Sequence, residues 1–168
     1  MNRLILCAAL FLGFFVQKAN AQDKVATTFN TSLEKYYVLK NALAADKAEE
    51  AQQAAVALQS AVKAVPHAGF KNDAQHQVWM KESALILTQA AELAKSTELK
   101  SQRKNFEGIS LAFIKATQAL ALNNSEAYVQ YCPMGKFSWL NEVKEIQNPY
   151  YGNAMYDCGS VKSTIGKK

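Results

Sequence analysis

A helical repeat of apolar residues runs through most of this chain and limits the folds open to it. Between residues 26 and 120, apolar side chains recur at spacings of three and four, the period of one face of an α-helix. Four segments share the pattern, at about 26–45, 46–66, 73–96 and 100–120, and they are rich in good helix formers. Because short connections favour antiparallel neighbours, the sequence predicts a mainly α fold, an antiparallel up-down-up-down four-helix bundle.

The second of these segments carries a recognisable start signal. Asp46 is followed three residues later by Glu49, the spacing of a capping box that satisfies the first backbone N–H groups of a helix. We therefore expect the second helix to open at Asp46. Pro66 and Gly69 then mark its end.

Composition changes near residue 124, and the rest of the chain has a different character. Glycine, proline and aromatic residues become frequent over residues 125–168, which is typical of short strands joined by turns. Residues 128–131 and 137–140 are expected as two strands around the turn at Cys132-Pro133-Met134-Gly135. The sequence thus predicts a helical bundle over residues 22–124 and a small irregular or β C-terminal cap over 125–168, within one domain.

The first residues have the organisation of a secretory signal peptide. Arg3 precedes an apolar run over residues 4–16, and Ala-Asn-Ala at 19–21 places small residues at the −3 and −1 positions of a cleavage site. The run is short for a bilayer span, and Cys7 lies too early to carry a lipid anchor. We expect cleavage after residue 21, export, and no membrane span in the mature chain.

Charge and motifs argue against two classes of function. The chain has 19 basic and 14 acidic residues, a net charge of +5, and the loss of Arg3 and Lys18 with the leader leaves +3. This excess is spread thinly, so binding to nucleic acid is not expected. No Ser/His/Asp set, phosphate-binding glycine loop or His-Glu-x-x-His motif is present, and no Cys-x-x-Cys indicates a thiol oxidoreductase. We expect no enzymatic activity.

The two cysteines of the mature chain each have a methionine nearby. Met134 lies two residues after Cys132, and Met155 lies three before Cys158. Thiolate and thioether ligands favour Cu(I), so a folded tail that joined these four sulfurs would create a soft-metal site. A structural disulfide is the commoner use of two cysteines in an exported protein. Residue types alone leave both interpretations open.

A second, weaker candidate lies in the third predicted helix. Met80 follows His76 by four residues, so the two side chains share one helix face. Imidazole broadens the metals accepted to Zn(II) or Cu(II), although an incidental helix pair is the simpler explanation. His67, beside Pro66, is expected to be a loop residue without a partner.

Several motifs follow one another in a fixed order along the chain. They are Tyr131-Cys132-Pro133-Met134, Trp139-Leu140, Ile146-x-Asn148-Pro149-Tyr150-Tyr151-Gly152 and Met155-x-x-Cys158-Gly159, preceded in the helical part by Tyr37, Leu39, Lys40, Leu43 and Asp46 and by Gln102-Arg103-x-x-Phe106 with Ser110. Together they resemble the domain of unknown function 3347 (DUF3347) family. That domain occurs alone in exported proteins and at the end of periplasmic adaptor subunits of copper and silver efflux systems.

The resemblance implies a periplasmic module that handles copper or a similar soft metal. It implies Cys132, Met134, Met155 and Cys158 as Cu(I) ligands, with His76 and Met80 as a second site. It also implies an efflux adaptor, or another periplasmic metal-handling protein, as the partner. The chain has no room for the membrane-fusion domains of an adaptor, so a free-standing module is expected. The alternative is a disulfide-stabilised interaction domain that binds no metal and uses an exposed Tyr150-Tyr151 turn.

Overall fold

The computed structural model describes the backbone of residues 2–168 and the side chains of residues 21–168. The side chains of the predicted leader before Ala21, including Cys7, lie outside the described residues. The elements in order are α1 (Asn2–Ala44), α2 (Ala48–Lys63), α3 (Asp73–Lys95), α4 (Leu99–Leu120), β1 (Ala127–Cys132), β2 (Phe137–Asn141), the 3-10 turn η1 (Gly152–Ala154) and β3 (Ser160–Ile165).

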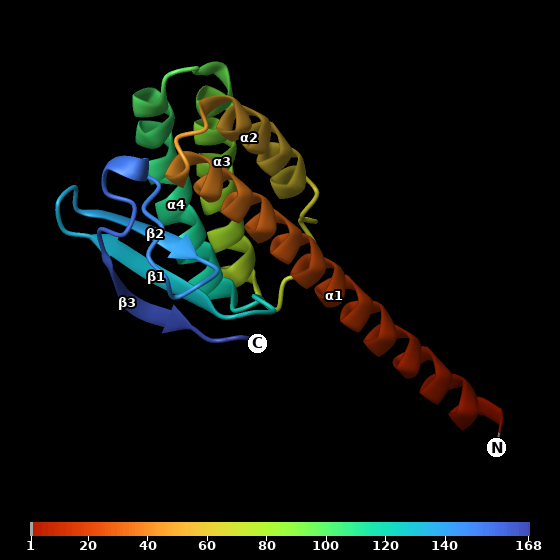
Figure 1. Ribbon diagram of the computed structural model, residues 1–168. Helices are drawn as coiled ribbons and strands as arrows, with labels where there is room; N and C mark the ends of the chain where they lie inside the picture. The colour runs from red at the N-terminus through yellow and green to blue at the C-terminus, as the bar shows by residue number, and fades with distance from the viewer. Residues whose placement is uncertain (1) are drawn as a thin grey trace.

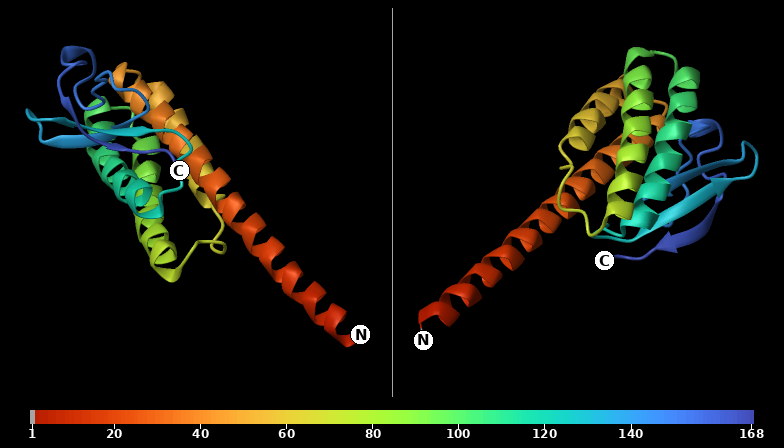
Figure 2. Two further views of the ribbon diagram at one scale, coloured as in Figure 1. Left: turned by 90° about the horizontal axis from the view of Figure 1, so that it is seen from below. Right: turned by 180° about the vertical axis from the view of Figure 1, so that it is seen from behind.

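The four helices form the predicted bundle. Successive helices run in alternating directions, and α1 extends beyond the bundle at its N-terminal end (Figures 1 and 2). Each helix packs against the next one in the chain. The apolar residues that set the helical period are buried: Phe29, Leu33, Tyr36 and Leu43 in α1; Ala51, Ala55, Leu58 and Val62 in α2; Trp79, Ile86, Ala90 and Leu93 in α3; Phe106, Ile109, Phe113, Ala116 and Leu120 in α4. The prediction of a mainly helical bundle is confirmed.

The start of α2 differs from the sequence-based expectation. Asp46 has a φ of 59°, and the N-cap of α2 is Lys47, which makes no side-chain capping bond. The Asp46 carboxylate accepts hydrogen bonds from Arg103 and from the backbone N–H of Asn153 instead. The predicted capping box is therefore wrong, because Asp46 is used to connect distant elements.

The C-terminal cap is a three-stranded antiparallel sheet with the order β2-β1-β3. It lies across α4 (Figure 1), and β2 makes the contact, with the Ser110 hydroxyl of α4 donating to the carbonyl oxygen of Ser138 at 3.0 Å. The two predicted strands are confirmed, in a register that pairs Gln130 with Trp139. Strand β3 was not predicted. It pairs with β1 and closes the cap so that residues 132 and 158 come together.

No helix in the described part of the chain combines the length and the apolar character needed to cross a bilayer.

Candidate functional site

The two cysteines of the cap are in contact. Cys132 is the last residue of β1, and Cys158 lies two residues before β3, which pairs with β1. Their Sγ atoms are 3.2 Å apart and both thiols are free. Cys132 is buried, whereas Cys158 is partly exposed. The fold thus brings together two side chains that are 26 positions apart in the sequence.

The surroundings of the pair favour a thiolate on Cys132. Burial alone would raise the pKa of Cys132, but hydrogen bonds from Cys158, from the backbone N–H groups of Gly135 and Met134, and from Asn148 lower it below its usual range. The pKa of Cys158 is raised, first because of its hydrogen bond with Cys132 and then because of burial. Of the two thiols, Cys132 is therefore the one that loses its proton first as the pH rises.

The two methionines lie in the turns that adjoin the cysteines. Met134 occupies the turn between β1 and β2 and is 68% exposed. Met155 follows η1 and is partly buried, and its carbonyl oxygen accepts the N–H of Cys158 at 3.1 Å. Neither side chain belongs to the hydrophobic core. The structure brings the two cysteine sulfurs into contact. It also places the solvent-exposed thioether of Met134 two residues after the buried Cys132.

Asn148 organises the loop that presents Cys158. Its buried side chain donates to the carbonyl oxygen of Cys158 at 2.9 Å and accepts the N–H of Tyr150 at 2.9 Å. Its own backbone N–H donates to Tyr156, and its carbonyl oxygen accepts from Gly152. The Asn148-Pro149-Tyr150-Tyr151-Gly152 motif therefore positions the second cysteine against the first.

The second predicted pair is arranged differently from the expectation. The sulfur of Met80 lies 3.1 Å from Nδ1 of His67, the residue expected to have no partner. His76 packs against the ring of Phe70, with centroids 5.5 Å apart. The connection between α2 and α3 folds back onto α3, and spacing within one helix could not reveal this. The expectation that His67 lacks a partner is wrong.

Conventional metal ligands are sparse in the described part of the chain. No group of three or more His, Cys, Asp and Glu side chains converges there in a way that could hold an ion. A metal site at the cysteines would therefore depend on thioether sulfur to complete its coordination.

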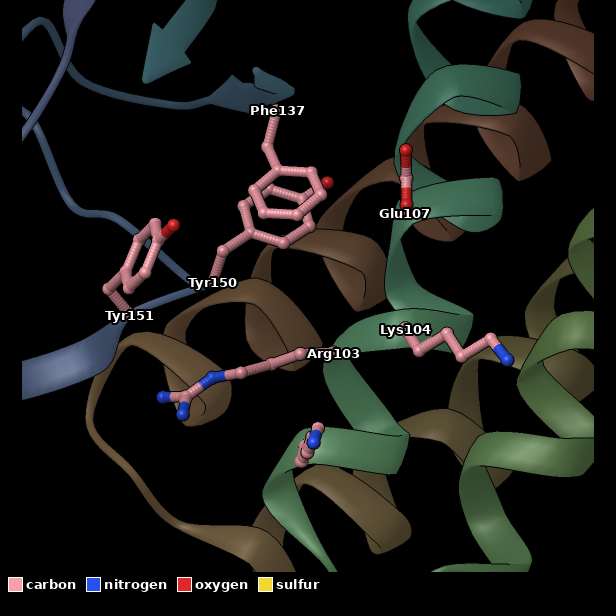
Figure 3. Close-up of a pocket in the computed structure, with 7 residues that line it drawn as sticks. Arg103, Lys104, Glu107, Phe137, Tyr150 and Tyr151 are labelled. Carbon is pink, nitrogen blue, oxygen red and sulfur yellow. The ribbon is translucent and has the colours of Figure 1, made fainter. Parts of the chain in front are cut away.

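A pocket of about 410 Å³ opens between α4 and the cap (Figure 3). The aromatic side of the pocket is formed by Phe137, Tyr150 and Tyr151, and α4 contributes Lys100, Arg103, Lys104 and Glu107. Tyr150 is 6% exposed and stacks on Phe137, with centroids 4.2 Å apart. The sequence predicts an exposed turn at Tyr150-Tyr151, but the ring of Tyr150 is buried and the ring of Tyr151 is half-buried. The predicted exposure of Tyr150 is therefore wrong. Only the folded structure places these rings beside the cationic residues of α4.

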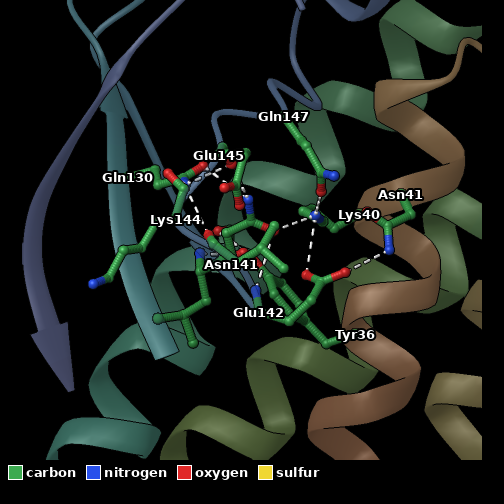
Figure 4. Close-up of polar contacts among 12 residues, drawn as sticks. Tyr36, Lys40, Asn41, Gln130, Asn141, Glu142, Lys144, Glu145 and Gln147 are labelled. Carbon is green, nitrogen blue, oxygen red and sulfur yellow. Dashed lines mark hydrogen bonds and ion pairs between the residues drawn. The ribbon is translucent and has the colours of Figure 1, made fainter. Parts of the chain in front are cut away.

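A polar cluster fixes the other end of β2 to α1 (Figure 4). Lys40 is 0% exposed. Its ammonium group donates a hydrogen bond to Oδ1 of Asn141 and another, of 2.6 Å, to Oε1 of Gln147. It also forms an ion pair with Glu142 at 3.1 Å. Burial lowers the pKa of Lys40 to about 8, and the Glu142 carboxylate opposes that shift. The polar groups around Lys40 bond to one another, so we assign the cluster a structural role.

Comparisons with known proteins give one result. A family model described as protein of unknown function (DUF3347) matches residues 33–125, which extend from α1 to just before β1. Comparison with curated proteins and with solved structures gave no match. The matched segment holds the bundle and ends before both cysteines. Because it covers more than half of the 168 residues, the chain belongs to the DUF3347 family.

Proposed function

We propose that this protein is an exported, periplasmic soft-metal-binding module, which holds a copper-type monovalent ion between Cys132 and Cys158 with thioether sulfur from Met134. The observation that carries the proposal is the contact of the two sulfurs beside backbone N–H groups that favour a thiolate. A thiolate is the form of cysteine that binds metals. Thiolate and thioether sulfur together favour Cu(I) over harder ions.

The sulfur separation suits a metal as well as it suits a disulfide. Ligands at about 2.3 Å from an ion in tetrahedral geometry lie about 3.8 Å from each other. The 3.2 Å between Cys132 and Cys158 would have to widen by about 0.6 Å, within the reach of one side-chain adjustment. A disulfide requires the sulfurs to close to about 2.05 Å, so the contact is compatible with either use of the pair.

Access and ligand type favour the metal. Cys158 is partly exposed, and the 68% exposed Met134 lies in the turn that follows Cys132. A methionine that only filled space would be expected in the core. Export follows in this proposal from the leader-like residues 1–21, and the partner would be an efflux adaptor or another periplasmic protein that passes on soft metals. No catalytic step is proposed.

The test is a competition titration of the reduced protein with Cu(I) and a chromophoric chelator. We expect one tightly bound ion per chain, loss of this binding in the double variant C132S/C158S, and weaker binding in M134L. M80L serves as the matched methionine control, since Met80 lies in α3 beside His67, and should leave the tight site unchanged. Full affinity in the double cysteine variant would refute the proposed site.

A second function rests on the same sulfur contact. If the reduced protein binds no Cu(I), the 3.2 Å pair is a disulfide precursor, and the chain is a disulfide-stabilised interaction domain. Thiol counting on protein isolated from its exported location, without reductant, separates the two proposals. Two free thiols together with a bound metal support the metal-binding module. The absence of free thiols supports the disulfide-stabilised domain.

A further inference from the structure

We infer that the pocket between α4 and the cap is a binding site for a small aromatic carboxylate, separate from the sulfur pair. The inference rests on the combination of aromatic rings on one side with cationic side chains from α4 on the other (Figure 3). A volume of about 410 Å³ is within the range of small-molecule sites.

The aromatic side is rigid before any ligand arrives. Tyr150 stacks on Phe137, and its hydroxyl donates to the carbonyl oxygen of Ser138 at 3.1 Å. A Cβ at Gly135 would overlap the ring of Phe137 and come within 2.9 Å of the Tyr151 hydroxyl. The turn thus packs directly against two rings of the pocket. A ligand ring would find its stacking surface already formed, which reduces the entropic cost of binding.

The cationic side of the pocket carries positive charge that is not neutralised by ion pairs within the described residues. Among residues 21–168, no ion pair involves Lys100, Lys104 or Glu107. Arg103 is committed to Asp46, Leu43 and Pro149 through Nη2 and Nε, and its guanidinium extends beneath Tyr150 and Tyr151 (Figure 3). Two uncommitted lysines against one glutamate leave a local excess of positive charge. This excess selects an anion over a cation.

The shape and charge together define the ligand class. An aryl ring would lie against the partly exposed rings of Phe137 and Tyr151, and a carboxylate one or two bonds from the ring would meet the lysine ammonium groups. A purely apolar ligand would leave the cationic side unused, and an aromatic amine would face repulsion from it. The negative charge of Glu107 opposes the carboxylate, so its removal should tighten binding.

The test is isothermal titration of the full chain with two probes that share one ring system. Indole-3-propionate carries a carboxylate and tryptamine carries an ammonium group. We expect indole-3-propionate to bind and tryptamine to bind at least about tenfold more weakly. E107Q should bind indole-3-propionate more tightly, a gain that unfolding cannot produce. Binding should also weaken as salt is raised, because the charges are exposed.

Variants of the two sides complete the test. The double variant K100A/K104A should weaken binding about fivefold to tenfold, and Y151A by a similar factor. K115A is the matched control, an exposed lysine three turns further along α4 that does not line the pocket. The inference is overturned by equal binding of the two probes, by no binding of indole-3-propionate up to about 10 mM, or by equal losses in K115A and K100A/K104A.

Discussion

Arg103 and Asp46 form an ion pair that joins three separate parts of the fold. Arg103 lies in α4, Asp46 follows α1, and the other carboxylate oxygen of Asp46 accepts the backbone N–H of Asn153 in η1 at 2.9 Å. Arg103 also donates to the carbonyl oxygens of Leu43 and Pro149, at 2.9 Å each. A Cβ at Gly152 would overlap this pair. The bundle and the cap are therefore held together at a partly buried polar junction.

Replacing Arg103 by alanine should lower the free energy of unfolding by about 2–3 kcal/mol, because two carbonyl oxygens and a carboxylate lose their donor. R103K should recover only part of this, since lysine cannot reproduce the geometry of the guanidinium group. Urea denaturation measures both. Q118A, an exposed change elsewhere on α4, should alter stability by less than about 0.5 kcal/mol. An equally stable R103A would contradict the proposed junction.

The buried Lys40 predicts an unusual pH dependence. Its pKa is lowered from 10.5 to about 8 by burial, so between these values the unfolded chain holds a proton that the folded chain has released. The free energy of unfolding contributed by Lys40 should therefore rise with pH from about 8 toward 10, by an amount on the order of 2 kcal/mol. The raised pKa values of Tyr36 and Tyr37 act in the opposite direction at higher pH.

Comparison with a variant isolates the Lys40 contribution. Urea denaturation of wild type and K40M across pH 7–9.5 should give a stability difference that grows in favour of the wild type above pH 8. K35M, at an exposed lysine of the same helix, should run parallel to the wild type. A constant difference between wild type and K40M would mean that Lys40 titrates normally.

The hydroxyl of Tyr36 connects α1 to both α4 and the sheet. It accepts the backbone N–H of Leu140 at 3.0 Å and lies 2.9 Å from Oγ of Ser110, all in the buried core. Y36F should cost about 1–3 kcal/mol, since it leaves a buried N–H without an acceptor. Thermal or urea unfolding measures this loss. Y156F, at a tyrosine that is 40% exposed, is the control and should be nearly neutral.

Oxidation of the sulfur pair should stabilise the fold. A disulfide between Cys132 and Cys158 would close a loop of 26 positions and add roughly 3 kcal/mol on the chain-entropy model. Denaturation of the protein in oxidised and in reduced glutathione, with thiol counting, measures the gain. C132S/C158S should show no difference between the two conditions. An oxidised protein less stable than the reduced one would mean that the cap cannot accept the bond without strain.

The helical part of the fold could be predicted because its signal is local and repeated. Apolar residues such as Leu58 and Phe113 recur at helical spacing over many turns, and the structure buries them. The strands β1 and β2 were also within reach, because Cys132-Pro133-Met134-Gly135 marks the turn between them. The contact of Cys132 with Cys158 was a hypothesis from the sequence, and the structure places their Sγ atoms 3.2 Å apart.

The elements that sequence reasoning missed depend on contacts between distant residues. Asp46 has the spacing of a capping residue, but its strongest partner is 57 positions away. His67 meets Met80 only because the loop after α2 folds back onto α3. The pocket joins residues of α4 between 100 and 107 to rings between 137 and 151, which are distant in the sequence. Strand β3 lacks the alternation of buried and exposed residues that identifies a strand.

The exposure of β3 has a consequence for how the molecules behave toward each other. This strand lies at an edge of the sheet and five of its six residues are exposed, which leaves backbone groups open to pairing with another chain. Lys162 stands on this edge, 5.1 Å above the ring of Tyr131, and a register shift interrupts the pairing of β1 with β3 between Val129 and Gln130. A charged, irregular edge is a poor template for a further strand. The features of β3 therefore disfavour the addition of a strand from another molecule to this edge of the sheet.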